Sequence, residues 1–149
     1  MDADMRVLII EARYYEDISN ALLDGAMDAL KKYQGLEIIT ITVPGALEIP
    51  HVISIAEKEA AGYDGYIALG CVIRGETTHY DYECTESARA LMDLAIGNQL
   101  AIGNGIITVE NSDQAWARAD LNRKNKGGFA AETVLRMISI KDEMKANNV

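Results

Sequence analysis

The amino-acid sequence predicts an α/β protein, a flavodoxin-like, doubly wound, three-layer sandwich around a four-stranded parallel sheet. Two observations predict this fold. Four continuous runs are rich in apolar and β-branched residues, and each is followed by a segment in which apolar residues recur at helical spacing. Because parallel strands need long crossovers, which helices supply, this alternation places helices on both faces of the sheet. Since no linker or repeat divides the 149 residues, we expect a single domain, 1–149.

The four runs are the expected strands, over residues 5–12, 37–43, 65–73 and 100–109. The first is a nearly unbroken apolar stretch, as is typical of strands covered on both faces. The second is rich in β-branched residues, which favour extended backbone. Glycines in the fourth indicate that another element packs closely against it.

Helical spacing marks the segments between the strands. The first helix is expected to end near Gly35, which suits a C-cap, and the second to carry Pro50 in its first turn. The inward positions of the third are Cys84, Ala88, Leu91 and Ala95. A short helix near 114–118 is followed by a last helix, whose inward positions are Ala131, Val134, Leu135 and Ile138. The polar tail 141–149 is expected to fray.

The composition excludes several classes of protein. The chain has 14 Lys and Arg against 23 Asp and Glu, a net charge of −9. Nucleic acids and anionic membranes are bound mainly by cationic surfaces, so neither is an expected partner. The run from Val7 to Ile10 is too short for a signal-peptide core, and Cys71 and Cys84 fit no metal spacing. We therefore expect a cytoplasmic protein without a metal, whose cysteines are small buried side chains.

In a doubly wound sheet, ligands bind beyond the carboxyl ends of the strands. After the first strand come Tyr14 and Tyr15, which could stack on a planar ring or simply cover a helix end. After the second strand, Pro44 and Gly45 allow a tight turn before Glu48. Glu48 lies near a helix start, where a carboxylate is favoured by the helix dipole, and it could equally accept hydrogen bonds from a substrate.

The loop after the third strand is the richest in polar side chains. A glycine followed by hydroxyl residues at a helix start suits an anion, and Thr78 with Asp81 also fits a capping box; both readings can hold together. His79 lies beside this candidate anion site and titrates near neutrality, which suits proton transfer. The other histidine, His51, has no such neighbours and is interpreted as structural.

After the fourth strand, the segment 118–126 holds four bases and one acid in an otherwise acidic chain. A solvated turn explains most of these charges, although a phosphate would need only one well-placed arginine. No serine, cysteine or lysine nucleophile has a partnered base in the sequence pattern. The loops together therefore point to chemistry between two bound substrates, aided by positioning and proton transfer.

Three motifs resemble the lumazine synthase family. They are VPGALEIP after the second strand, GCVIRGETTHYDYE across the third strand and its loop, and NGIITVENSDQAWARA followed by NKGG. The resemblance covers nearly the whole chain and implies a transferase of riboflavin biosynthesis that needs no cofactor. The implied reaction condenses 5-amino-6-(D-ribitylamino)uracil with 3,4-dihydroxy-2-butanone 4-phosphate, releases phosphate and forms 6,7-dimethyl-8-ribityllumazine.

The resemblance also implies roles for individual residues. His79 is the proton shuttle, Tyr14 stacks on the pyrimidine, and Arg118 clamps the phosphate. The remaining implied substrate contacts are Ala46, Leu47, Glu48, Cys71, Val72, Ile73, Glu76, Thr77, Asn104 and Lys126. Asn104 and Lys126 match positions that reach the substrate from a neighbouring subunit.

Departures from the family pattern motivate alternatives. Tyr14, Tyr15 and Leu47 differ from the usual residues around the ring, so a paralogue that mainly binds or stores flavins is the second hypothesis. A phosphate-responsive module without a flavin link is the third. The turn 122–127 differs from that of capsid-forming members, so we expect a homo-oligomer that is a pentamer or a dimer of pentamers rather than an icosahedral shell.

Overall fold

A parallel sheet forms the centre of the molecule. The computed structural model describes residues 5–147. Its strands are β1 (Met5–Ala12), β2 (Leu36–Val43), β3 (Gly65–Ile73) and β4 (Ile102–Val109). All neighbouring pairs are parallel, in the order β2-β1-β3-β4. The order reverses beside β1, as in a doubly wound sheet, so the predicted fold class is confirmed.

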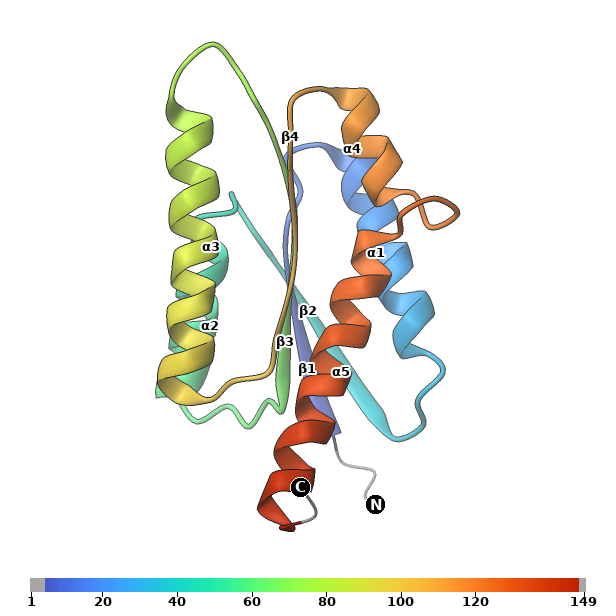
Figure 1. Cartoon of the computed structure of the whole chain (residues 1–149), viewed down its shortest axis with the longest axis vertical. Coiled ribbons are helices and arrows are strands. Elements are labelled where there is room, and N and C mark those ends of the chain that lie inside the picture. Colours follow the sequence, from blue (N-terminus) through green and yellow to red (C-terminus); the bar gives the residue numbers. More distant parts are fainter. Residues whose placement is uncertain (1–4, 148–149) are drawn as a thin grey trace.

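Helices cover both faces of this sheet. They are α1 (Glu16–Leu30), α2 (Glu48–Lys58), α3 (His79–Asn98), α4 (Ser112–Ala119) and α5 (Lys126–Lys145). α2 and α3 lie on one face, and α1, α4 and α5 lie on the other (Figure 1). This arrangement is the predicted three-layer sandwich. No helix within residues 5–147 is both long and apolar enough to cross a membrane.

Alternate residues of β1 supply the two halves of the core. Val7 and Ile9 pack in the layer of α1 and α5, and Leu8 and Ile10 pack in the layer of α2. All four side chains are at most 1% exposed. Burying such a side chain contributes roughly 1.5–3 kcal/mol, so this strand anchors both layers and fixes where its carboxyl end lies.

Close packing explains the glycines of β4. A Cβ at Gly103 would lie 2.0 Å from the carbonyl oxygen of Ala130, which places the α5 backbone directly against the strand. A Cβ at Gly127 would lie 2.1 Å from the carbonyl oxygen of Leu22, so α5 also meets α1 closely. The predicted close approach at the fourth strand is confirmed.

Two predicted helix ends are wrong. α1 ends at Leu30, and Gly35 instead adopts φ +75° in the turn before β2. α5 continues to Lys145, so the expected fraying does not hold for residues 141–145. Buried Ile138 and a hydrogen bond of 2.7 Å from Lys141 Nζ to the carbonyl oxygen of Gln99 hold this end of the helix. Residues 148–149 lie outside the described part of the chain.

The inward face of α3 is rotated from the predicted one. Leu91 is buried as predicted, but Ala88 is exposed and its neighbour Ser87 is buried instead. Ser87 can be buried because its hydroxyl donates to the carbonyl oxygen of Cys84 at 3.3 Å. The outer face of α3 leaves three large apolar side chains exposed, namely Tyr82, Met92 and Ile96.

Candidate functional site

A cavity of about 320 Å³ lies where β1, β2 and β3 end. Parallel strands bring their carboxyl ends to one edge of the sheet, and α3 begins at this end of the molecule (Figure 1). Six of the thirteen residues predicted for the site line this cavity: Tyr14, Ala46, Cys71, Val72, Ile73 and His79. The fold therefore joins residues from three separate motifs.

Two tyrosines form one wall of the cavity. Tyr14 is 79% exposed, and its ring meets that of Tyr15 edge to face, with 4.9 Å between the centroids and 80° between the planes. Tyr15 is half-buried, and burial, followed by the nearby Cys71, Tyr14 and Glu83, raises the pKa of its hydroxyl above the usual value. The free face of Tyr14 is thus available for stacking, supported from behind by Tyr15.

A buried carboxylate anchors the loop that carries these tyrosines. Glu11 is 4% exposed, and its Oε1 accepts from Arg13 Nη1 at 2.6 Å. Its Oε2 accepts from the Thr42 hydroxyl at 3.2 Å. The neighbouring strands β1 and β2 are therefore tied together one residue before β1 ends. Spacing alone gives no signal for the contact with Thr42, because this residue lies 31 positions from Glu11 in the sequence.

The turn after β2 forms the next wall. Ala46 is buried under it, whereas Leu47 and Glu48 are exposed and flank the cavity without lining it. Glu48 begins α2, as predicted, and its Oε1 lies 3.0 Å from the position that a Cβ of Gly45 would occupy. The absence of a side chain at Gly45 therefore leaves room for this carboxylate beside the cavity.

The loop between β3 and α3 carries Glu76 and Thr77, both exposed and outside the cavity lining. Thr78 occupies the N-cap of α3, but its side chain makes no capping hydrogen bond, so the predicted capping box is wrong. The preceding Thr77 hydroxyl accepts from the His79 backbone N–H at 3.3 Å instead. The N-cap backbone of Thr78, at ψ 1°, is far from the extended conformation that a capping side chain usually accompanies.

Arg74 holds this loop against the sheet. Its Nε donates to Glu110 at 2.8 Å, its Nη1 lies 3.4 Å from Asp81, and its guanidinium lies 4.3 Å from the ring centroid of Tyr80. These contacts join the end of β3, the segment after β4 and the first turn of α3. Arg74 therefore positions the start of α3, including His79. Its positive charge is already paired with Glu110 and Asp81.

The imidazole of His79 faces a carboxylate. His79 Nε2 lies 3.4 Å from Glu83 Oε1, one helical turn further along α3. Beneath them, burial raises the pKa of the Cys71 thiol to about 12. Cys71 therefore stays protonated at neutral pH and forms an apolar floor, whereas the His79–Glu83 pair is the polar part of the lining.

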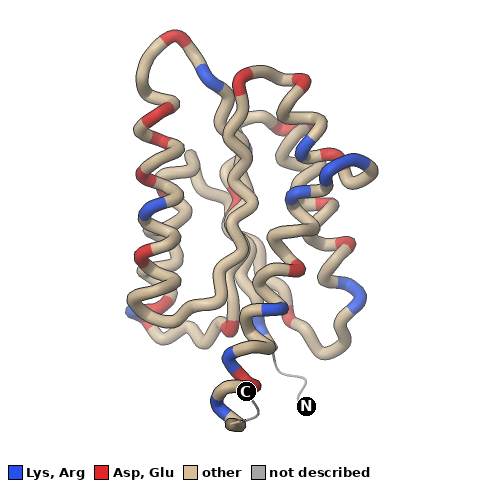
Figure 2. Tube along the Cα trace, viewed as in Figure 1, with Lys and Arg blue, Asp and Glu red and all other residues tan. Residues whose placement is uncertain are grey.

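Three predicted residues lie elsewhere. Asn104, Arg118 and Lys126 line a second cavity of about 270 Å³ between β4, α4 and α5, and no residue lines both cavities. Arg118 Nη1 donates to the carbonyl oxygen of Gln114 at 3.1 Å, and Lys126 Nζ lies 5.3 Å from the ring centroid of Phe129. Basic side chains gather on the turn between α4 and α5 (Figure 2). The predicted residues therefore form two groups on one chain.

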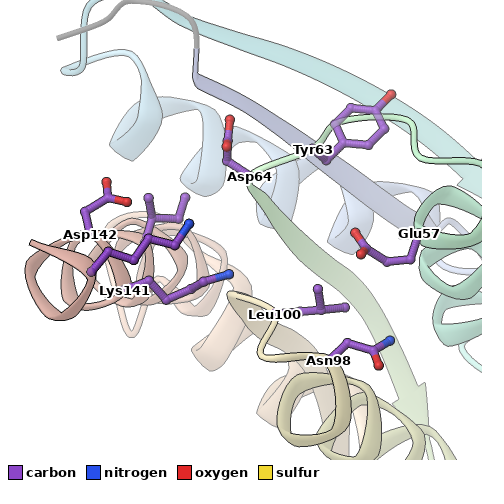
Figure 3. Close-up of a pocket in the computed structure, with 9 residues that line it drawn as sticks. Glu57, Tyr63, Asp64, Asn98, Leu100, Lys141 and Asp142 are labelled. Carbon is purple, nitrogen blue, oxygen red and sulfur yellow. The ribbon is translucent and has the colours of Figure 1, made fainter.

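A further cavity, of about 210 Å³, lies at the opposite end of the sheet and contains none of the predicted residues (Figure 3). Two of its charged side chains have partners within the protein. Asp64 accepts from the Arg6 backbone N–H at 2.8 Å, and Lys141 donates to a backbone oxygen. Within residues 5–147, no three His, Cys, Asp or Glu side chains gather as a metal site would require.

Sequence reasoning missed Glu83 and Phe129, which line the first and second cavities respectively. Glu83 follows His79 by four residues, and this i,i+4 spacing was a usable signal once α3 was placed. Phe129 gave no signal, because only the tertiary structure brings it beside β4.

Comparison with known proteins finds one matching family and several relatives that are similar along nearly the whole chain. Residues 4–142 match the family model described as 6,7-dimethyl-8-ribityllumazine synthase. A protein of that name from Bartonella tribocorum is 60% identical over 141 residues, covering 95% of this chain and 93% of the relative. 6,7-dimethyl-8-ribityllumazine synthase 1 from Rhizobium meliloti is 53% identical and covers 95% of both chains. The synthase from Methylorubrum populi is 55% identical, covering 93% of this chain and 84% of the relative.

Proposed function

Because this chain belongs to the 6,7-dimethyl-8-ribityllumazine synthase family, we propose that it catalyses the reaction for which that family is named. It condenses 5-amino-6-(D-ribitylamino)uracil with 3,4-dihydroxy-2-butanone 4-phosphate, releasing phosphate, in riboflavin biosynthesis. It is a transferase. The identity to several named synthases along nearly the whole chain favours catalysis over flavin storage.

The observation that carries the proposal for the site is the cavity at the strand ends. Tyr14 offers an exposed aromatic face at its mouth, and the end of β3, from Cys71 to Ile73, lies in its wall. The pyrimidine stacks on Tyr14 while polar groups of the ring meet the backbone of the β3 end. Leu47 and Glu48 then face the ribityl chain from the adjacent turn, where Glu48 accepts hydroxyl hydrogen bonds.

His79 transfers protons in this proposal. The amine of the pyrimidine attacks the ketone, and an imine forms with loss of water. Phosphate is then eliminated, and the ring closes with loss of a second water. The condensation steps move protons from nitrogen to oxygen, and the elimination removes a proton from the carbon next to the one that carries the phosphate. The imidazole lies in the cavity wall at the start of α3, where it can take part in these transfers. A positioned acid–base group of this kind typically contributes 10²-fold or more.

The phosphate lies at the loop before α3. Glu76 and Thr77 belong to this loop, and the positive end of the α3 helix dipole favours an anion there. The guanidinium of Arg118 is the clamp, since a planar fork of N–H donors matches phosphate oxygens. Arg118 lies in the other cavity of its own chain, so the clamp comes from a neighbouring copy.

A shared site requires a homo-oligomer, in which the second cavity of one subunit meets the strand-end cavity of the next. Asn104 and Lys126 then approach the substrate from the neighbour together with Arg118. Head-to-tail contacts of this kind close into rings, which supports a pentamer or a dimer of pentamers. The location is cytoplasmic and no cofactor takes part in the reaction.

Lumazine fluorescence tests the proposed reaction. The purified protein is mixed with both substrates, and the rate of fluorescence increase is compared with that of the uncatalysed mixture. A large, protein-dependent increase, matched by phosphate release, is the expected result. A rate equal to the uncatalysed one would refute catalysis, and a yellow protein with bound flavin but no turnover would favour the storage function.

A further inference from the structure

A carboxylate faces the proposed proton shuttle from within the same cavity. Glu83 Oε1 lies 3.4 Å from His79 Nε2, and both residues line the strand-end cavity. The side chain of Glu83 is 18% exposed, whereas that of His79 is 70% exposed. The carboxylate is therefore held by its surroundings, while the imidazole is the freer member of the pair.

The groups around this pair come from three other segments. Tyr15 contributes its half-buried hydroxyl from the loop before α1, and the negative charge of Glu83 is among the causes that raise its pKa. Cys71 contributes a protonated thiol from β3. Glu48 lies beyond Gly45, and Glu83 Oε2 is 3.9 Å from the position of a Cβ at Gly45. Among the described residues that line the cavity, Glu83 is the only carboxylate.

We propose that Glu83 is a positioning residue that orients the imidazole of His79 for the condensation. This inference rests on the proposed function, in which His79 transfers protons. Glu83 Oε1 accepts from Nε2–H, which leaves the lone pair of Nδ1 as the proton acceptor. The 3.4 Å separation is long for a hydrogen bond, and such contacts shorten when substrate fills a site.

The proton transfers give Glu83 a second role, which is to stabilise the charge that forms on His79. When the amine nitrogen bonds to the ketone carbon, Nδ1 takes the proton that the nitrogen loses. The imidazolium then has N–H groups on both nitrogens, and the carboxylate of Glu83 stabilises its charge. The imidazolium returns this proton to the ketone oxygen, which becomes a hydroxyl. A second transfer by the same route moves the remaining N–H proton to that hydroxyl as its bond to carbon breaks, so that water leaves and the imine forms. Glu83 itself does not touch the substrate in this sequence of steps.

Two substitutions separate orientation from charge. Glu83→Gln keeps an acceptor oxygen but removes the charge, and Glu83→Met removes both at similar length. Each is made with His79 intact and with His79→Ala, and kcat and KM are measured by lumazine fluorescence. Glu86→Gln is the matched control, since Glu86 is an exposed acid of the same helix outside the cavity lining.

We expect Glu83→Met to lower kcat roughly 2- to 6-fold, the range that a partly exposed ion pair supports, and Glu83→Gln to lower it less. KM should not change. In the His79→Ala background, neither substitution should lower kcat further, because the group that Glu83 orients is gone. Glu86→Gln should match the unsubstituted protein.

The results distinguish a failure of the proposed role of Glu83 from a failure of the proposed role of His79. If His79→Ala slows the reaction and neither Glu83 substitution does, only the role of Glu83 is overturned. An equal loss with and without His79 would likewise overturn it, as would a change confined to KM. If His79→Ala leaves kcat unchanged, the proposed proton transfer is refuted and the inference about Glu83 with it. Should Glu83→Met unfold, the near-isosteric Glu83→Gln still decides the question.

Discussion

Side chains that the reaction does not use determine where His79 lies. Arg74 joins the end of β3 to Glu110 and Asp81, so the first turn of α3 is fixed relative to the sheet. On the opposite wall, Glu11 and Arg13 fix the loop that carries Tyr14. These ion pairs explain how an exposed imidazole and an exposed ring keep a defined separation across an open cavity.

For single residues, the first prediction concerns His79. His79→Ala should lower kcat by about 10²-fold, the lower end of what a positioned acid–base group contributes. Steady-state lumazine fluorescence measures the loss. His51→Ala is the matched control, because His51 is exposed on α2 outside the cavity lining and its removal should leave kcat unchanged. Equal rates for both variants would remove His79 from the mechanism.

A second prediction concerns the thiol in the cavity floor. Burial raises the pKa of Cys71 to about 12, so at pH 8 its thiolate fraction is on the order of 10⁻⁴. The folded protein should therefore react very slowly with iodoacetamide at Cys71, and urea-unfolded protein should react rapidly. Peptide mass spectrometry locates the label. Rapid labelling of Cys71 in the folded state would show that the cavity floor is open to solvent.

Single residues also mark the limit of sequence reasoning. The residue types of Tyr14, Glu48 and His79 at strand ends were enough to single them out, because parallel strands deliver their loops to one edge. The pairing of Glu11 with Thr42 could not be predicted, since it depends on the register between two strands. The capping role of Thr78 was wrong because its backbone angles, not its residue type, decide that interaction.

Among the helices and strands, the close contact between β4 and α5 is where a substitution tests the packing most strictly. Gly103→Ala would place a Cβ 2.0 Å from the backbone oxygen of Ala130, and backbone cannot move aside cheaply. We expect a loss of about 1–3 kcal/mol in the free energy of unfolding, measured by urea denaturation. Gly97→Ala is the control, because a Cβ there meets nothing within 4 Å. Since Gly97 lies in the last turn of α3, its substitution should change the free energy of unfolding by less than the roughly 0.5–1 kcal/mol typical of a helix interior. Similar effects of both substitutions would contradict the close packing.

The elements were predictable to different degrees. Buried strands and long amphipathic helices follow from period and residue type, and their order fixes a parallel sheet. The inward face of α3 was misplaced because much of this helix is exposed in the single chain, so its apolar residues do not mark the core. The end of α5 was misplaced because a bond from Lys141 to a distant backbone oxygen extends it.

For the whole molecule, the charge distribution and the two cavities belong together. The net charge of −9 excludes nucleic acid as an expected partner, yet the segment 118–126 is locally basic and borders the second cavity. A phosphate ligand therefore meets this basic segment only if the second cavity forms part of the binding site. The exposed apolar residues of α3 are consistent with burial between copies, as the proposed ring requires.

Mixing two inactive variants tests the shared site most directly. His79→Ala and Arg118→Ala damage residues that lie in different cavities of one chain. In the proposed ring each site takes His79 from one subunit and Arg118 from its neighbour, so unfolding and refolding an equal mixture should leave about one quarter of the sites intact. Lumazine fluorescence should then show about a quarter of the activity of the unsubstituted protein. Activity no higher than the mean of the two variants would contradict the account, because it would mean that each chain completes its own site.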